Sequence, residues 1–226
     1  MGESSEGQWI QIALESGQSV RGWRKEASNP RGTLIIVQEI YGVNAHIRRV
    51  CADYAADGFT TIAPSFFDLV ETGIELGYSD EDTQRGRELV AALGMDNAMR
   101  IVGATRHAQA ATESVAVIGY CWGGAVAFLS ATRLGIPAIS YYGRLVEQFV
   151  HERPQAPLQF HFGQRDPLIP MTSVERTARH FPTVPLYTYD AGHAFNRLED
   201  AHGDPDAAAL AKRRSLSFLN ESLKGS

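Results

Sequence analysis

Short, continuous runs of apolar and β-branched residues alternate along this chain with longer stretches in which apolar residues recur every three or four positions. The runs are typical of strands buried on both faces of a parallel sheet, and the longer stretches of helices that cover such a sheet. Strands are predicted at Thr33–Gln38, Phe59–Ala63, Ser114–Ile118, Ile136–Tyr142, Ala156–Phe162 and Val184–Tyr189, of which Thr33–Gln38 and Ser114–Ile118 are expected to be buried. Helices are predicted at Asn44–Asp57, Asp80–Leu93, Asp96–Ala111, Gly124–Leu129, Pro170–Phe181 and Asp206–Leu223. This alternation predicts βαβ units.

The N-terminal region has a different pattern, in which polar and apolar residues alternate. Gln8–Leu14 and Ser19–Lys25 flank the polar turn Glu15–Gln18, which is typical of an antiparallel hairpin at a sheet edge. No repeat or linker interrupts the chain, and 226 residues suit one well-packed domain. We therefore expect a single α/β domain over residues 1–226, with a mostly parallel central sheet, flanking helices and an N-terminal antiparallel edge hairpin.

Composition narrows the class of protein and its partners. The chain is 44% hydrophobic and 21% charged, as soluble globular proteins are, and its formal net charge of −5 argues against nucleic acid or an anionic membrane as a partner. Cys51 and Cys121 are isolated in sequence, which favours reduced thiols and a cytoplasmic location over a disulfide framework. The pattern of a signal peptide is absent, and no apolar run approaches the roughly 18 residues of a membrane span.

Neither a metal nor a cofactor is predicted. The histidines lack the spacing and the cysteine partners of a metal site, and the glycines of Gly119–Gly124 are not spaced as in a dinucleotide fingerprint. His161, in an apolar strand, is interpreted as a hydrogen-bonded core histidine, and Cys51 as a small core residue. The expected ligand is therefore a small-molecule substrate alone.

The segment Gly119–Gly123 carries the most specific chemical signal. It reads Gly-Tyr-Cys-Trp-Gly between a buried strand and a helix, which is the G-x-S-x-G nucleophile elbow with cysteine in place of serine. Glycines flank such a turn because a Cβ there would clash with the strand or the helix. The cysteine stands at a helix N-terminus, where the partial positive charge favours a thiolate. Cys121 is therefore predicted to be a nucleophile.

A cysteine nucleophile needs a base, and the base needs a carboxylate that orients it. In α/β folds with an elbow these partners follow in the order nucleophile, acid, histidine, at the carboxyl ends of strands. Asp166 and His193 each follow a predicted strand and have this order. Asp190 is an alternative acid, but it stands just before His193 in the same loop. Cys121, Asp166 and His193 are therefore the predicted triad.

The loop after the strand Thr33–Gln38 is predicted to complete the site. The tetrahedral oxyanion needs fixed donors, for which we expect the backbone N–H groups of Trp122 and Ile40. Glu39 in this loop is unexpected, because a carboxylate beside a thiol raises the pKa of the thiol. Its alternative interpretation is a solvated loop acid or a partner for an arginine.

Four segments together resemble the dienelactone hydrolase family: Gln38–Asn44, Gly119–Gly124, Gly163–Asp166 and Ala191–Phe195. The similarity is collinear over nearly the whole chain, and a cysteine elbow combined with a Q-E-I-x-G-V-N loop is rare among α/β hydrolases. The resemblance implies a monomeric α/β-hydrolase fold with a Cys-His-Asp triad. It also implies the carboxymethylenebutenolidase activity, in which an enol-lactone is hydrolysed to a linear dicarboxylate during catabolism of chlorinated aromatic compounds.

The resemblance also implies roles for charged residues. In the family, the glutamate that matches Glu39 pairs with the resting cysteine, is displaced by substrate and then takes the thiol proton. Two arginines hold the substrate carboxylate, and Arg197 and Arg85 match these positions. The alternative for Arg85 is a solvated or ion-paired side chain on the surface of the predicted helix Asp80–Leu93.

This chain departs from the family pattern around the expected pocket. Leu89–Leu93 stands where aromatic residues line the pocket, Ala194 where a serine often occurs, and Trp122 where a smaller aliphatic residue is common. The tyrosines Tyr41 and Tyr141–Tyr142 either line the pocket or are buried. The first hypothesis is a cysteine hydrolase that opens a small carboxylate-bearing enol-lactone through a Cys121 thioester. The alternatives are a broad carboxylesterase or thioesterase with the same triad, and a catalytically silent ligand-binding relative.

Overall fold

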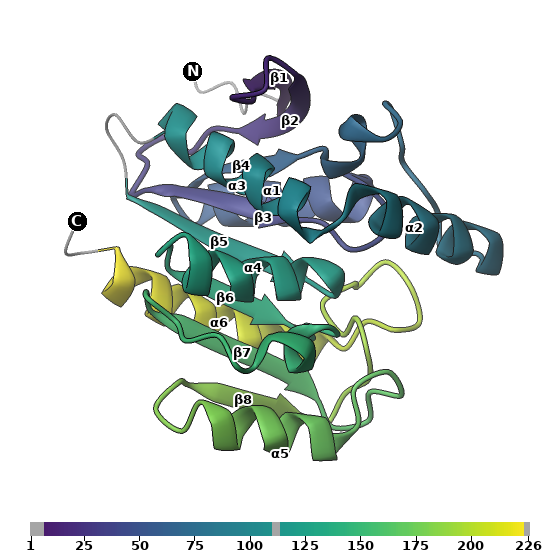
Figure 1. The fold of residues 1–226 in the computed structure, drawn as a ribbon. Coiled ribbons are helices and arrows are strands. Elements are labelled where there is room, and N and C mark those ends of the chain that lie inside the picture. Colours follow the sequence, from purple (N-terminus) through teal and green to yellow (C-terminus); the bar gives the residue numbers. More distant parts are fainter. Residues whose placement is uncertain (1–6, 110–113, 224–226) are drawn as a thin grey trace. The chain divides into compact units, whose positions relative to one another are not determined.

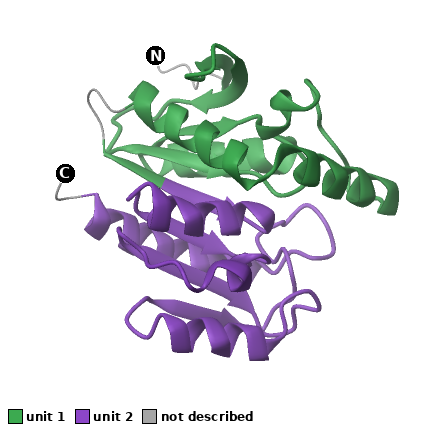
Figure 2. Cartoon of the chain, in the orientation of Figure 1, with its two compact units in different colours: residues 1–116 green, residues 117–226 purple. Residues whose placement is uncertain are grey.

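The computed structural model describes residues 7–109 and 114–223 (Figure 1). The chain forms two compact units, residues 1–116 and residues 117–226 (Figure 2). Both are built from alternating strands and helices, as the sequence predicts. The expectation of a single domain over residues 1–226 stays a prediction.

The strands of the first unit follow the order β1-β2-β4-β3. β1 (Gln8–Ala13) and β2 (Ser19–Lys25) form an antiparallel hairpin with β1 outermost, which confirms the predicted edge hairpin. β2 pairs antiparallel with β4 (Thr60–Pro64), and β4 pairs parallel with β3 (Thr33–Val37). Every residue of β3 and β4 is buried, which explains their continuous apolar and β-branched sequences.

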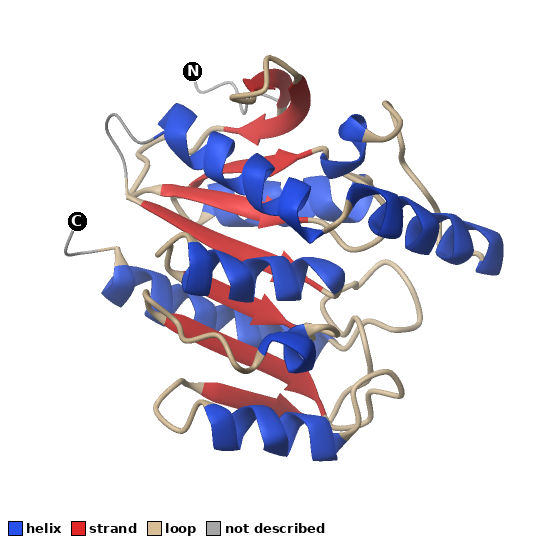
Figure 3. Cartoon of the chain, in the orientation of Figure 1, coloured by secondary structure: helices blue, strands red, loops and turns tan. Residues whose placement is uncertain are grey.

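The helices of the first unit begin where the sequence places capping residues. α1 (Ala45–Ala56) begins after Asn44, whose side chain accepts a hydrogen bond from the Ile47 N–H, and a capping box begins α2 (Asp80–Leu93). α3 (Met95–Gln109) follows directly; its predicted end at Ala111 lies outside the described residues. Figure 3 shows α1 and α3 on opposite faces of the unit's strands.

The segment of residues 65–77, for which the sequence predicts no regular element, is anchored at both ends within the first unit. It contains the short 3-10 helix η1 (Phe66–Leu69), and the Asp68 carboxylate accepts hydrogen bonds from the backbone N–H of Arg21 at 3.0 Å and from its Nε at 2.8 Å. Burial alone would raise the pKa of Asp68, but these bonds hold it below its usual value. At the other end, the Leu76 N–H donates to the Tyr41 carbonyl at 2.9 Å.

The strands of the second unit are parallel and follow the order β5-β6-β7-β8. They are β5 (Val115–Tyr120), most of which lies in this unit, β6 (Ala138–Tyr141), β7 (Leu158–Gly163) and β8 (Leu186–Tyr189). The helices are α4 (Trp122–Arg133), α5 (Met171–His180) and α6 (Pro205–Ser222), with the 3-10 helix η2 (Val146–Phe149). Figure 3 shows α4 and α5 on one face of these strands and α6 on the other.

α4 differs from the other helices because almost every residue in it is buried. Its sequence is apolar on all sides, as expected for a helix enclosed by its own domain. The turn that begins α4 is therefore held by packing around the whole helix. In residues 7–109 and 114–223, no helix has both the length and the apolar content needed to cross a membrane.

Candidate active site

Cys121 occupies a strained turn between β5 and α4. Its backbone has φ 55° and ψ −114°, a left-handed conformation that costs a non-glycine residue about 1–3 kcal/mol. The Cys121 N–H donates to the Tyr141 carbonyl at 3.0 Å, and the Cys121 carbonyl accepts from the Gly124 N–H at 3.0 Å. These bonds join the turn to the end of β6 and to the first turn of α4.

The glycines around Cys121 are required by close backbone contacts. A Cβ on Gly119 would lie 1.8 Å from the Gly123 carbonyl oxygen, and one on Gly124 would lie 2.6 Å from the Cα of Gly143. Real Cβ atoms do not approach backbone this closely, so the elbow cannot form with larger residues there.

The structure brings Asp166 and His193 together. Asp166 follows β7, and its side chain has no exposed surface; its Oδ2 lies 2.6 Å from the Nδ1 of His193. The other oxygen, Oδ1, accepts hydrogen bonds from the backbone N–H groups of Leu168 at 2.7 Å and Ile169 at 3.2 Å. These bonds fix the carboxylate in the orientation that holds the imidazole.

Asp190, the alternative acid, lies on the surface. Its side chain is 76% exposed, and its Oδ1 lies 3.2 Å from the Nε of Arg165. Asp166 is therefore the carboxylate that contacts His193.

The pKa of His193 is raised from its usual 6.5 to about 10. Burial alone would lower this pKa, because it penalises the charged imidazolium. The charge of Cys121, the hydrogen bond to Asp166, the contact with the Cys121 side chain and the charge of Asp166 together outweigh burial. Nε2 of His193 is buried and has no well-formed hydrogen bond among the described residues, although the Cys121 side chain is close enough to raise the pKa. His193 therefore carries a proton at neutral pH when Cys121 is charged.

In the first unit, the loop between β3 and α1 carries Glu39 and Ile40. Glu39 is only 2% exposed, so it is not the solvated loop acid that was one interpretation. The backbone of α2 contacts this loop closely, since a Cβ on Gly86 of α2 would lie 2.2 Å from the Ile40 carbonyl oxygen. Gly42 has φ +81° and forms a bridge with Glu75. The backbone that presents the Ile40 N–H is therefore fixed from two sides.

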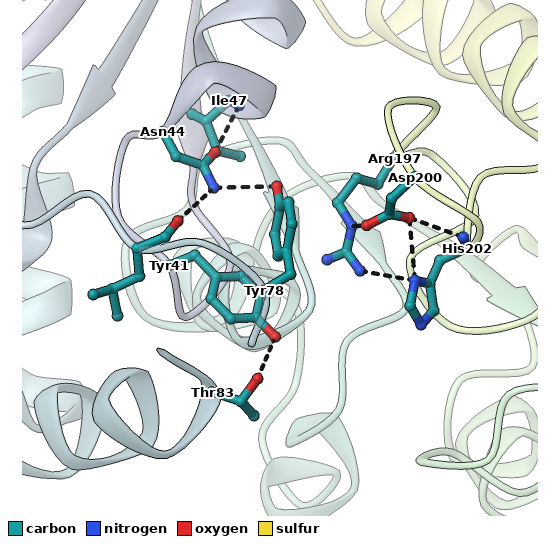
Figure 4. Close-up of polar contacts among 9 residues, drawn as sticks. Tyr41, Asn44, Ile47, Tyr78, Thr83, Arg197, Asp200 and His202 are labelled. Atoms are coloured by element: carbon teal, nitrogen blue, oxygen red, sulfur yellow. Dashed lines mark hydrogen bonds and ion pairs between the residues drawn. The ribbon is translucent and has the colours of Figure 1, made fainter. Parts of the chain in front are cut away.

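A polar network adds to this support (Figure 4). The Tyr41 hydroxyl lies 3.2 Å from Oγ1 of Thr83, and the Asn44 amide donates to the Tyr78 hydroxyl at 3.1 Å. The rings of Tyr41 and Tyr78 pack edge to face, with their centroids 4.8 Å apart. Sequence reasoning missed the roles of Tyr78, Thr83 and Gly86, because no local pattern indicates contacts between residues about forty positions apart.

The two predicted carboxylate-binding arginines have different surroundings. Arg197 is buried, and its Nε donates to Asp200 at 2.6 Å while its Nη2 lies 3.2 Å from Nδ1 of His202 (Figure 4). Burial raises the pKa of Asp200, but the His202 N–H and the Arg197 charge hold it below its usual value. Arg85, on α2, is 42% exposed and is ion-paired with Glu71 and, at 3.7 Å, with Glu88. The carboxylate-binding role of both arginines stays a prediction.

Cys51 and His161, which the sequence predicts to be core residues, are both buried. Cys51 is fully buried, and burial raises the pKa of its thiol to about 12. His161 is buried between hydrogen bonds to the Tyr189 hydroxyl at 2.7 Å and to Gln159 at 2.9 Å, and burial lowers its pKa to about 3. Both stay uncharged at neutral pH.

Comparisons with known proteins agree with these observations. Residues 21–223 match the model of the Dienelactone hydrolase family. The chain is 31% identical over 205 residues to carboxymethylenebutenolidase from Pseudomonas putida, covering 85% of this chain and 87% of the relative. It is 31% identical over 209 residues to carboxymethylenebutenolidase 1 from Cupriavidus pinatubonensis, covering 86% and 88%. The crystal structure of a putative dienelactone hydrolase from Klebsiella pneumoniae is similar with a TM-score of 0.83, at 24% identity over 95% of this chain and 98% of that one. This likeness confirms the α/β-hydrolase fold.

Proposed function

We propose that this chain, which belongs to the dienelactone hydrolase family, opens a small carboxylate-bearing enol-lactone through a thioester on Cys121. Membership of the family makes the chain a hydrolase of the lactone or ester type. The observation that carries the proposal is the 2.6 Å hydrogen bond between His193 and Asp166, on a histidine whose pKa responds to Cys121. A cysteine with only a packing role would need neither a histidine beside it nor a carboxylate that orients the histidine.

In the first half-reaction, the Cys121 thiolate attacks the lactone carbonyl carbon, and the carbonyl oxygen takes the negative charge. The backbone N–H groups of Trp122 and Ile40 are the proposed donors to this oxyanion. When the intermediate collapses, the ring C–O bond breaks and the departing enol oxygen takes the proton of the His193 imidazolium. The raised pKa of His193 supports this role, because the imidazole then carries its proton before the reaction begins.

In the second half-reaction, water hydrolyses the thioester. Neutral His193 accepts a proton from the water as its oxygen attacks the thioester carbonyl, the C–S bond breaks, and the thiolate of Cys121 is restored. Asp166 keeps the proton of the imidazole on Nδ1 and stabilises the imidazolium that forms. The product is the open-chain acid, which loses its proton to solvent.

Glu39 is the proposed acceptor of the proton of the resting thiol. This assignment follows the family resemblance, in which the glutamate that matches Glu39 takes the thiol proton and His193 keeps its own. The burial of Glu39 supports this assignment, because its carboxylate faces protein or substrate and not bulk water. Displacement of Glu39 by the substrate carboxylate would couple ionisation of the thiol to binding.

The substrate carboxylate is assigned to Arg197 and Arg85, whose planar guanidinium groups suit it. One observation favours the broad carboxylesterase as a second candidate function. Arg197 already holds the Asp200 carboxylate, and Arg85 is exposed and paired with Glu71. If these internal pairs persist with substrate, the site does not select anionic substrates.

The test compares turnover of an anionic enol-lactone with that of a neutral p-nitrophenyl ester in the wild type, Cys121→Ala and Arg197→Gln. We expect a higher kcat/KM for the lactone, and a loss of at least about 10³-fold for both substrates in Cys121→Ala. Arg197→Gln should raise KM for the lactone and leave the ester unchanged. After acid quenching, intact mass spectrometry should show Cys121 carrying the mass of the whole lactone, since the leaving oxygen stays attached.

Two results would contradict the proposal. Wild-type turnover by Cys121→Ala would rule out the nucleophile. Equal kcat/KM for lactone and ester, unaffected by Arg197→Gln, would favour the broad carboxylesterase.

A further inference from the structure

Left-handed backbone at residues other than glycine occurs, within the described ranges, at Cys121 (φ 55°), Tyr142 (φ 37°) and Ala194 (φ 58°). Such conformations persist only where the surroundings impose them, and they cluster at functional sites. Cys121 is the proposed nucleophile, and Ala194 directly follows the proposed base, His193. Tyr142, just after β6, has no role in the mechanism above.

The backbone around Tyr142 is tied to the turn that holds the nucleophile. The preceding residue, Tyr141, accepts the hydrogen bond from the Cys121 N–H at 3.0 Å, and the Tyr142 N–H donates to the His161 carbonyl at 2.7 Å. The following residue, Gly143, touches the first turn of α4, because a Cβ on Gly143 would lie 3.1 Å from the carbonyl carbon of Gly124. Tyr142 therefore cannot move without moving its contacts with the elbow.

The side chain of Tyr142 lies against the imidazole. Its ring centroid is 5.1 Å from that of His193, with 60° between the planes, and the side chain is fully buried. The same ring packs on Phe195 at 5.3 Å and on Tyr120 at 6.1 Å. Phe195 follows His193 by two positions and Tyr120 directly precedes Cys121, so one ring contacts the neighbours of both reacting residues.

We propose that Tyr142 is a positioning residue whose ring prevents the His193 imidazole from pivoting away from Cys121. Asp166 holds only Nδ1 of the imidazole, and Nε2 has no well-formed hydrogen bond in the described part of the chain. The imidazole is attached through Cβ and held at Nδ1, which still leaves rotation about the line through these two points, and a packed ring can block that rotation. This inference rests on the proposed role of His193, and a displacement of the base by about 1 Å reduces turnover by about 10²-fold.

The test uses Tyr142→Leu, which removes the ring, and Tyr142→Phe, which keeps it without the hydroxyl. The matched control is Phe160→Leu, since Phe160 is an equally buried aromatic residue whose ring contacts are with Phe128, Phe162 and Phe181. Steady-state kinetics on the enol-lactone give kcat and KM. Proton NMR of the free enzyme records the far-downfield Nδ1–H signal of the His193–Asp166 hydrogen bond, a readout that needs no substrate.

We expect Tyr142→Leu to lower kcat by about 10- to 100-fold with KM within about twofold, and to broaden or remove the downfield signal. Tyr142→Phe should keep the wild-type kcat and downfield signal, and Phe160→Leu should change neither of them. Wild-type kcat and signal in Tyr142→Leu would overturn the inference, as would an equal loss in Tyr142→Phe or in Phe160→Leu. If the wild type fails to open the lactone, the proposed function is wrong, and the NMR comparison still decides the positioning role.

Discussion

The charge on His193 is the property of the site that is most open to direct measurement. Its pKa of about 10 results from burial, which lowers it, and from the larger opposing effects of Cys121 and Asp166. The substitution Cys121→Ala removes the charge of Cys121 and leaves burial and the Asp166 contact in place. We therefore expect the pKa of His193 to fall in this variant.

The size of the fall follows from the site. The difference between about 10 and the ordinary 6.5 corresponds to about 5 kcal/mol of preference for the imidazolium, at about 1.4 kcal/mol for each pKa unit. The side chain is only 12% exposed, so solvent screens this preference little. Cys121 is the largest of the causes that raise the pKa, which makes a fall of at least about two units the expected result.

The assay is an NMR titration of the imidazole signals in free enzyme, with His193 assigned from a His193→Gln variant. In the wild type the His193 signal should stay in its protonated position through neutral pH and titrate near pH 10, whereas in Cys121→Ala it should titrate at least about two units lower. The signal of His161, whose pKa is about 3, should stay constant in both and serves as the internal control. A wild-type midpoint near 6.5, or one that Cys121→Ala leaves unchanged, would refute the reasoning.

Further predictions concern the loop between β3 and α1. Gly86→Ala would place a Cβ 2.2 Å from the Ile40 carbonyl oxygen, so we expect a stability loss of about 1–3 kcal/mol in thermal unfolding and at least a tenfold lower kcat, at about constant KM. Gly103→Ala, in α3 with open space at its Cβ, is the matched control and should gain about 0.5–1 kcal/mol; equal kcat in both variants would contradict a role for the loop. Glu39→Gln removes the proposed proton acceptor, so lactone turnover should fall at least about tenfold. Unchanged turnover would show that Glu39 does not take the thiol proton.

The positions of the buried parallel strands could be predicted closely, because such strands are largely apolar or β-branched. The ends of the strands could not be predicted, because a strand ends where the backbone conformation changes and the apolar pattern does not record that change. The run Ile136–Tyr142 gave a longer strand than β6 (Ala138–Tyr141), which starts after Pro137 and stops where Tyr142 turns to φ 37°. Pro137 has no N–H to donate, and the turn at Tyr142 depends on packing that no local pattern records.

The candidate site divides in the same way. The contact between Asp166 and His193 could be predicted, because both follow strands in the order that the elbow fold requires. The pairing of Arg85 with Glu71 could not be predicted, since it joins a helix to a loop fourteen residues away. The partner of Arg197, Asp200, is only three residues away in sequence, yet only the folded loop shows that its carboxylate turns inward.

The location of one proton connects these observations. The family resemblance implies a resting cysteine that is guarded by Glu39, whereas the raised pKa of His193 requires charge on Cys121. The proposed mechanism satisfies both, because in it the thiol proton passes to Glu39 and His193 keeps its own beside a charged Cys121. In that arrangement His193 acts first as an acid and becomes a base only after the ring has opened. A histidine with this order of tasks must stay in place through both half-reactions, which gives a physical reason for a buried, strained Tyr142 against its ring.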